Sequence, residues 1–167
     1  MRTLVIGVGN LYRRDDGAGI HVVNQLKKKA PTLDVIDVAL GSVEILEAMI
    51  GYERVIIVDA MVTGAEPGSY FQVNIASGDE PPVVSYSHGI DLITTLELGK
   101  RLYTDQMPKE LMVIGIEVED TLTMSEECTP RVRDAVEKVV DEIIAIVKSR
   151  LYQNSESEIL IKLLLNI

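Results

Sequence analysis

The chain alternates between short apolar runs and longer stretches in which apolar residues recur at helical spacing. Five runs have the length and composition of β-strands, namely Leu4–Val8, Leu33–Ala39, Arg54–Ala60, Gly68–Ile75 and Glu110–Glu117. Helical spacing begins near Asp16, Ser42, His88 and Thr129. Because strands and helices alternate, the pattern predicts a three-layer α/β/α domain with a mostly parallel five-stranded sheet.

Two of the predicted strands have distinctive patterns. Arg54–Ala60 (RVIIVDA) is a continuous β-branched run, as expected of a strand buried on both faces of a parallel sheet, and Asp59 interrupts it near its end. Gly68–Ile75 alternates between polar and apolar residues. We expect this segment to be an edge strand, for which an antiparallel orientation is an option. The following segment, Ala76–Ser87, contains one glycine and two prolines and is expected to be a long, functional loop.

The last predicted helix is the most clearly defined one. It starts at Thr129-Pro130, where a capping residue precedes a proline in the first helical position. Its apolar residues recur at intervals of four and three positions, at Val132, Val136, Val139, Ile143 and Ile146. Such a stripe predicts that one face of the helix packs against the core.

The composition changes after Arg150, where the polar segment Asn154–Glu158 precedes the mostly apolar Ile159–Leu165. We therefore divide the chain into a single domain, residues 1–150, and a C-terminal tail, residues 151–167. The tail could extend the last helix, dock on a partner or dimerise the chain, and its pattern does not select among these roles.

Composition narrows the class of protein. The chain has 167 residues with 16 basic and 26 acidic side chains, and an acidic balance argues against a nucleic acid partner. A single cysteine, Cys128, fits a reducing compartment, and no apolar run is long enough to span a bilayer. The first residues lead directly into a strand without the architecture of a signal peptide. We expect a cytoplasmic monomer without a membrane partner.

A glycine-rich turn follows the first predicted strand. Gly7 and Gly9 give the beginning of a dinucleotide fingerprint, but Tyr12 occupies the place of its third glycine. Asp15 and Asp16 then put negative charge at the helix start, where a phosphate would otherwise bind. Two carboxylates on a tight turn favour a cation instead. A nucleotide-binding α/β domain therefore remains a weaker hypothesis.

Three residues form the candidate site: Asp16 after the first strand, Asp59 at the end of the most apolar strand, and His88 after the long loop. If the first and third strands are parallel neighbours, both carboxylates lie at the edge of the sheet where open α/β folds bind ligands. Two carboxylates and an imidazole could bind zinc or nickel. Each residue also has a simpler explanation, because Asp16 or Asp15 could cap a helix, Asp59 could hold a loop, and His88 could lie on the surface.

Other titratable residues are expected to be structural. His21 lies beside the apolar stripe of the first helix, and Cys128 has no histidine nearby in the sequence to activate it. Glu117, Glu119 and Asp120 follow the fifth strand and could line the same edge, but an acidic run is usually solvated.

The candidate residues lie in motifs that resemble those of the hydrogenase maturation endopeptidases. The motif G-V-G-N-x-x-x-x-D-D-G-x-G spans Gly7–Gly19, V-D-A spans Val58–Ala60, and a serine-containing loop, Ser85–Ser87, leads into His88. The resemblance implies an aspartic-type endopeptidase that removes the C-terminal extension of a nickel-iron hydrogenase large-subunit precursor after nickel insertion. By position, the nickel-contacting and catalytic residues of the family correspond to Asp16, Asp59 and His88.

The resemblance also implies that the nickel is supplied by the substrate and that no organic cofactor is needed. Either the nickel or a carboxylate could activate the attacking water. No nucleophile–base pair for an acyl-enzyme route is evident. The competing hypothesis is a non-hydrolytic metal-binding module or nickel chaperone that uses the same three residues.

Overall fold

The computed structural model of the chain describes residues 2–39, 42–75 and 92–164. Five strands form one sheet in the order β2-β1-β3-β5-β4. Their bounds are β1 Thr3–Val8, β2 Asp34–Val38, β3 Arg54–Met61, β4 Tyr70–Ile75 and β5 Glu110–Glu117. All neighbours are parallel except β4 and β5, which pair antiparallel at the edge. The predicted mixed sheet and its antiparallel edge strand are confirmed.

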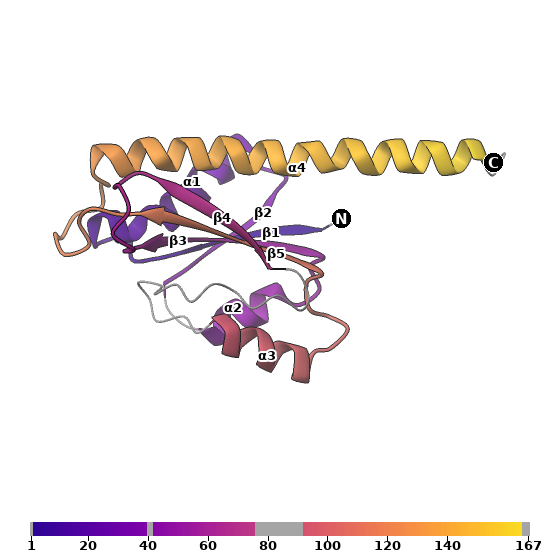
Figure 1. Cartoon of the computed structure of the whole chain (residues 1–167), viewed down its shortest axis with the longest axis horizontal. Coiled ribbons are helices and arrows are strands. Elements are labelled where there is room, and N and C mark those ends of the chain that lie inside the picture. The colour runs from indigo at the N-terminus through magenta and orange to yellow at the C-terminus, as the bar shows by residue number, and fades with distance from the viewer. Residues whose placement is uncertain (1, 40–41, 76–91, 165–167) are drawn as a thin grey trace.

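Helices cover both faces of this sheet, which confirms the predicted three layers. The helical elements are η1 Arg14–Gly17, α1 Ala18–Lys29, α2 Ser42–Met49, α3 Leu92–Leu102 and α4 Pro130–Leu164. Figure 1 shows α1 and α4 on one side of the sheet and α2 and α3 on the other. None of the helices in the described ranges combines the length and apolar character needed to cross a membrane.

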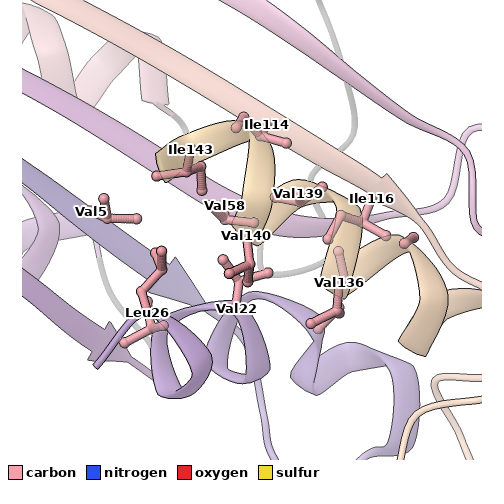
Figure 2. Packing of buried hydrophobic residues seen from close by; sticks show 14 of the residues in the cluster. Val5, Val22, Leu26, Val58, Ile114, Ile116, Val136, Val139, Val140 and Ile143 are labelled. Carbon is pink, nitrogen blue, oxygen red and sulfur yellow. The ribbon is translucent and has the colours of Figure 1, made fainter. Parts of the chain in front are cut away.

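Each face of the sheet has its own apolar core. On one face, side chains of β1, β3 and β5 pack against α1 and α4, as Figure 2 shows for Val58, Val22 and Val139. On the other face, alternate residues of the same strands pack against α2. Every residue of β3 is buried, as its continuous β-branched pattern predicts for a strand covered on both sides.

Three differences from the sequence prediction concern the candidate site and the C-terminal tail. Asp16 lies in η1, a 3₁₀ turn, rather than in the first turn of a regular helix. Strand β3 continues to Met61, so Asp59 is paired within the strand, opposite Gly115 of β5. Helix α4 continues to Leu164 because no glycine or proline interrupts it, and its C-terminal part extends beyond the rest of the domain (Figure 1). The tail therefore continues the helix as far as Leu164, and its docking on a partner or its dimerisation stays a prediction.

The chain reverses its direction of winding between β1 and β3. From β1 it passes through α1 to β2 at one edge, and from β2 it returns through α2, on the opposite face, to β3 on the other side of β1. In open α/β sheets, the crevice outside the strand ends at such a reversal is the usual ligand site. The carboxyl ends of β1 and β3 are therefore the place where a functional site is expected.

A glycine brings the first turn of α1 onto these two strands. A Cβ atom at Gly19 would overlap the backbone carbonyl oxygens of Val8 and Val58. The helix can approach the strand ends this closely only because residue 19 has no side chain. The last glycine of the Gly7–Gly19 motif thus serves packing between helix and sheet.

Replacing Gly19 by alanine should destabilise the fold, because the neighbouring atoms are backbone and cannot rotate away. We expect the free energy of unfolding to fall by about 3 kcal/mol or more, measured by urea denaturation. Gly64→Ala is the control, since its Cβ would meet nothing within 4 Å although its φ is +88°. That strain alone should cost about 1–2 kcal/mol, and equal losses in both variants would contradict the packing role of Gly19.

The α4 stripe provides a second test of the core. Val139 is completely buried, and Val139→Ala should lower the free energy of unfolding by about 2 kcal/mol through lost burial and a residual cavity. Val43, which is 59% exposed, provides the same substitution on the surface. Val43→Ala should change stability by less than about 0.5 kcal/mol. A comparable effect of the two substitutions in a chemical denaturation series would show that α4 is not packed as described.

Candidate active site

Asp16 is held in the turn that follows β1. Its side chain is 2% exposed, its amide donates to the Arg13 carbonyl at 3.0 Å, and its own carbonyl accepts from the Asn10 amide at 3.2 Å. Gly9 has a φ of +152°, and a Cβ there would overlap the Asp16 carbonyl oxygen. The glycine turn therefore closes directly onto the backbone of Asp16 and fixes where this residue lies relative to β1.

Asp59 approaches the same place from β3. Its side chain is completely buried, and its Oδ1 accepts from the amide of Ala60 at 2.8 Å. The β1–β3 ladder pairs Gly7 with Val58, so Asp59 follows one step beyond the last pair of this parallel register. A buried carboxylate in the middle strand of an apolar sheet is costly unless it is compensated, which marks Asp59 as a residue with a specific role.

The two carboxylates belong to the same edge of the sheet. η1 contacts β3 as well as α1, and both Asp16 and Asp59 come at the carboxyl ends of adjacent parallel strands. The conditional prediction that β1 and β3 are parallel neighbours is confirmed. His88 and the Ala76–Ser87 loop lie outside the described residues. Within the described ranges, no group of three or more histidine, cysteine or acidic residues is placed to hold a metal ion.

Asp15, which the sequence suggests only as an alternative helix cap, joins two segments of the chain. The side chain is completely buried, and it accepts hydrogen bonds from the segment after β5. The donors are the amides of Glu119 (3.1 Å), Asp120 (3.0 Å) and Thr129 (2.6 Å) and the hydroxyl of Thr129 (2.9 Å). Asp15 therefore ties the Asp16 turn to the start of α4.

The acidic residues at the end of β5 and after it do more than face the solvent. Glu117 is 3% exposed and accepts from the amides of Thr63 and Gly64, at 2.9 and 3.0 Å, and from the Thr63 hydroxyl at 2.7 Å. Asp120 accepts from the Leu122 amide and from the amide and hydroxyl of Thr123. The Thr123 hydrogen bonds lower the pKa of Asp120 to about 2. Glu117 and Asp120 thus hold loops at the site edge, whereas Glu119 is exposed as expected.

Cys128 and His21, which are far apart in the sequence, line the same cavity of about 290 Å³. The sequence shows no histidine close to Cys128 along the chain, whereas the fold places His21 of α1 on the wall of the same cavity. Burial, and then the charge of Asp15, raise the pKa of the Cys128 thiol to about 12, so it stays protonated at neutral pH. His21 Nε2 lies 2.8 Å from the Glu126 carbonyl oxygen. Cys128 and His21 are therefore not an activated nucleophile and its base.

An exposed apolar rim flanks the acidic edge, formed by Tyr12, Leu122 and Met124, with exposed fractions of 60%, 82% and 77%. The backbone beneath these side chains is fixed. The Ser125 amide donates to the Tyr12 carbonyl at 3.1 Å, and the Arg14 amide donates to the Ser125 carbonyl at 2.8 Å. The rim therefore presents large apolar side chains on two loops that are hydrogen-bonded to each other.

Comparisons with known proteins identify the family to which this chain is similar. A family model described as hydrogenase maturation protease matches residues 20–146. The hydrogenase 2 maturation protease of Escherichia coli is 26% identical over 156 residues, which cover 89% of this chain and 92% of the relative. The hydrogenase expression/formation protein HupD of Bradyrhizobium diazoefficiens is 26% identical, with 84% of this chain and 74% of the relative covered.

A solved structure has the same fold. The [NiFe] hydrogenase maturation protease HybD from Thermococcus kodakarensis superposes with a TM-score of 0.72 at 24% identity, over 87% of this chain and 99% of that protein. The family model covers most of the chain, from residue 20 to residue 146. The chain belongs to the hydrogenase maturation proteases, and it is an endopeptidase of that family.

Proposed function

We propose that this endopeptidase removes the C-terminal extension from the large-subunit precursor of a nickel-iron hydrogenase, in the cytoplasm, once nickel is in place. The observation that supports this most directly is the pair of buried carboxylates, Asp16 and Asp59, at the reversal point between β1 and β3. Their oxygens are ligands suited to a divalent cation. His88 completes the proposed set as a nitrogen ligand from the segment before α3.

In this proposal the nickel is part of the substrate. Asp16, Asp59 and His88 bind the nickel that the precursor carries, and this contact is the check that the metal has been inserted. The same contact orients the scissile peptide bond at the strand ends. The apolar rim of Tyr12, Leu122 and Met124 gives this edge a surface that a protein substrate would cover.

Hydrolysis adds water across the peptide bond. The water oxygen bonds to the carbonyl carbon, the carbon–nitrogen bond breaks, and the departing amine receives a proton. One of the two carboxylates can take the proton of the attacking water as a general base, or coordination to the substrate's nickel can lower the pKa of that water. The protonated Cys128 takes no part in either route, since a nucleophile would need the thiolate.

Substituting the three proposed residues tests their assignment. Asp16→Asn, Asp59→Asn and His88→Gln should each lower the rate of precursor cleavage by about 10²-fold or more, because each removes a charge or a ligand atom from the site. The side-chain carbonyl that Asp59→Asn introduces can still accept from the Ala60 amide, so the fold should persist. Electrophoresis of the precursor measures cleavage, and circular dichroism measures folding.

Asp37→Asn is the matched control, because Asp37 lies on β2 in an exposed ion pair with Lys27. It should process the precursor at the rate of the unmodified enzyme. If any of the three site variants retained that rate, the residue concerned would not belong to the active site.

Nickel dependence is tested with the precursor in two forms. The enzyme should shorten the nickel-loaded precursor and leave the nickel-free precursor at full length, because the nickel is needed to engage the acidic edge. Mass spectrometry of the released extension measures the outcome. Equal cleavage of both forms would contradict recognition through nickel. Nickel transfer without any shortening would instead identify a non-hydrolytic nickel chaperone.

A further inference from the structure

We propose that Asp15 is a positioning residue for Asp16, acting through the segment that joins β5 to α4. This inference rests on the proposed function, in which Asp16 contacts the substrate's nickel. Asp15 is adjacent to Asp16 in η1 and is completely buried. Its carboxylate lies away from the solvent and is directed at the backbone that leads into α4.

The hydrogen bonds of Asp15 are divided between its two oxygens. Oδ1 accepts from the Thr129 amide at 2.6 Å, and Oδ2 accepts from the amides of Glu119 and Asp120 and from the Thr129 hydroxyl. An ionised carboxylate, which has acceptor sites only, can satisfy all of these donors. A neutral amide could not, because its NH₂ group would face N–H donors.

The backbone on either side of Asp15 is tied to the same segment. The Asp15 amide donates to the Asp120 carbonyl at 3.0 Å, and the Arg14 amide donates to the Ser125 carbonyl at 2.8 Å. Arg14 adopts a φ of +48°, a conformation that a side-chain-bearing residue seldom takes. The surrounding contacts therefore hold residues 14 and 15 in a turn that the sequence alone would not favour, and Asp16 follows directly from it.

The consequence is that the position of Asp16 depends on residues more than one hundred positions away. The start of α4 is fixed in the core by its apolar stripe. Thr129, directly before this helix, is hydrogen-bonded to Asp15 and so fixes the position of Asp15 relative to α4. A small displacement of a reacting group is enough to lower a rate substantially. Loosening the Asp15 contacts should therefore impair catalysis even in a fully folded enzyme.

Thr129 allows a graded test. Thr129→Val replaces the hydroxyl donor with a methyl group of similar size, whereas Thr129→Ser keeps the donor. Asp15→Asn disturbs several donors at once. We expect kcat for the nickel-loaded precursor to fall by about 10²-fold in Asp15→Asn and about tenfold in Thr129→Val. Thr129→Ser should restore kcat to within about twofold of the unmodified enzyme, and KM should change little throughout.

All rates are compared well below the melting temperature of each variant, so that the folded fraction is the same. Amide hydrogen exchange at residues 14–16 should increase in the order Thr129→Ser, Thr129→Val, Asp15→Asn, following the loss of kcat. If Asp15→Asn and Thr129→Val melt at lower temperature but keep kcat, Asp15 is only structural and the positioning role is refuted. The Thr129 pair alone decides the question if Asp15→Asn does not fold.

Asp16→Asn separates this inference from the proposed function. If Asp16→Asn cleaves normally, the assignment of the active site fails, and with it any role of Asp15 through Asp16. If Asp16→Asn is inactive while Asp15→Asn and Thr129→Val are fully active, the active site stands and only the positioning role is lost.

Discussion

The parallel pairing of β1 with β3 is the constraint on which the rest of the site depends. It places the turn after β1 beside the end of a strand that is buried on both faces. The helices that connect β1 to β2 and β2 to β3, α1 and α2, lie on opposite faces of the sheet. Gly19 then lets α1 rest on the carbonyl groups of both strands. The distance between the two acidic residues is thereby determined by main-chain geometry.

Most of the fold could be predicted because its signals are local. A continuous β-branched run identified the central strand, alternation identified the antiparallel edge, and the four-and-three spacing identified α4. The 3₁₀ turn containing Asp16 could not be predicted, since the contacts that stabilise it come from residues 120–125. The same holds for the cavity shared by Cys128 and His21. The spacing of apolar residues indicates which face of one helix or strand is buried. It does not indicate which distant loop contacts that helix or strand.

The candidate site was predictable to a similar extent. Asp16 and Asp59 interrupt legible apolar patterns, and the structure brings both to one edge. His88 remains a prediction from the sequence. The sequence did not predict the roles of Asp15 and Glu117. A carboxylate that accepts hydrogen bonds from the backbone amides of a distant loop produces no periodic pattern in the sequence. A weak signal does exist for Glu117: it ends an apolar strand, where an unpaired charge would be unfavourable.

The closed turn after β1 also affects whether this edge could bind an anion. The amides of residues 9, 10 and 12–16 all donate to oxygen atoms of the chain itself. An anion such as a phosphate needs several convergent N–H groups with no other acceptor, and this glycine-rich turn uses those groups in its own folding. Glycines that resemble a nucleotide-binding signature therefore build a turn whose N–H groups are already engaged, unlike those of a phosphate-binding loop.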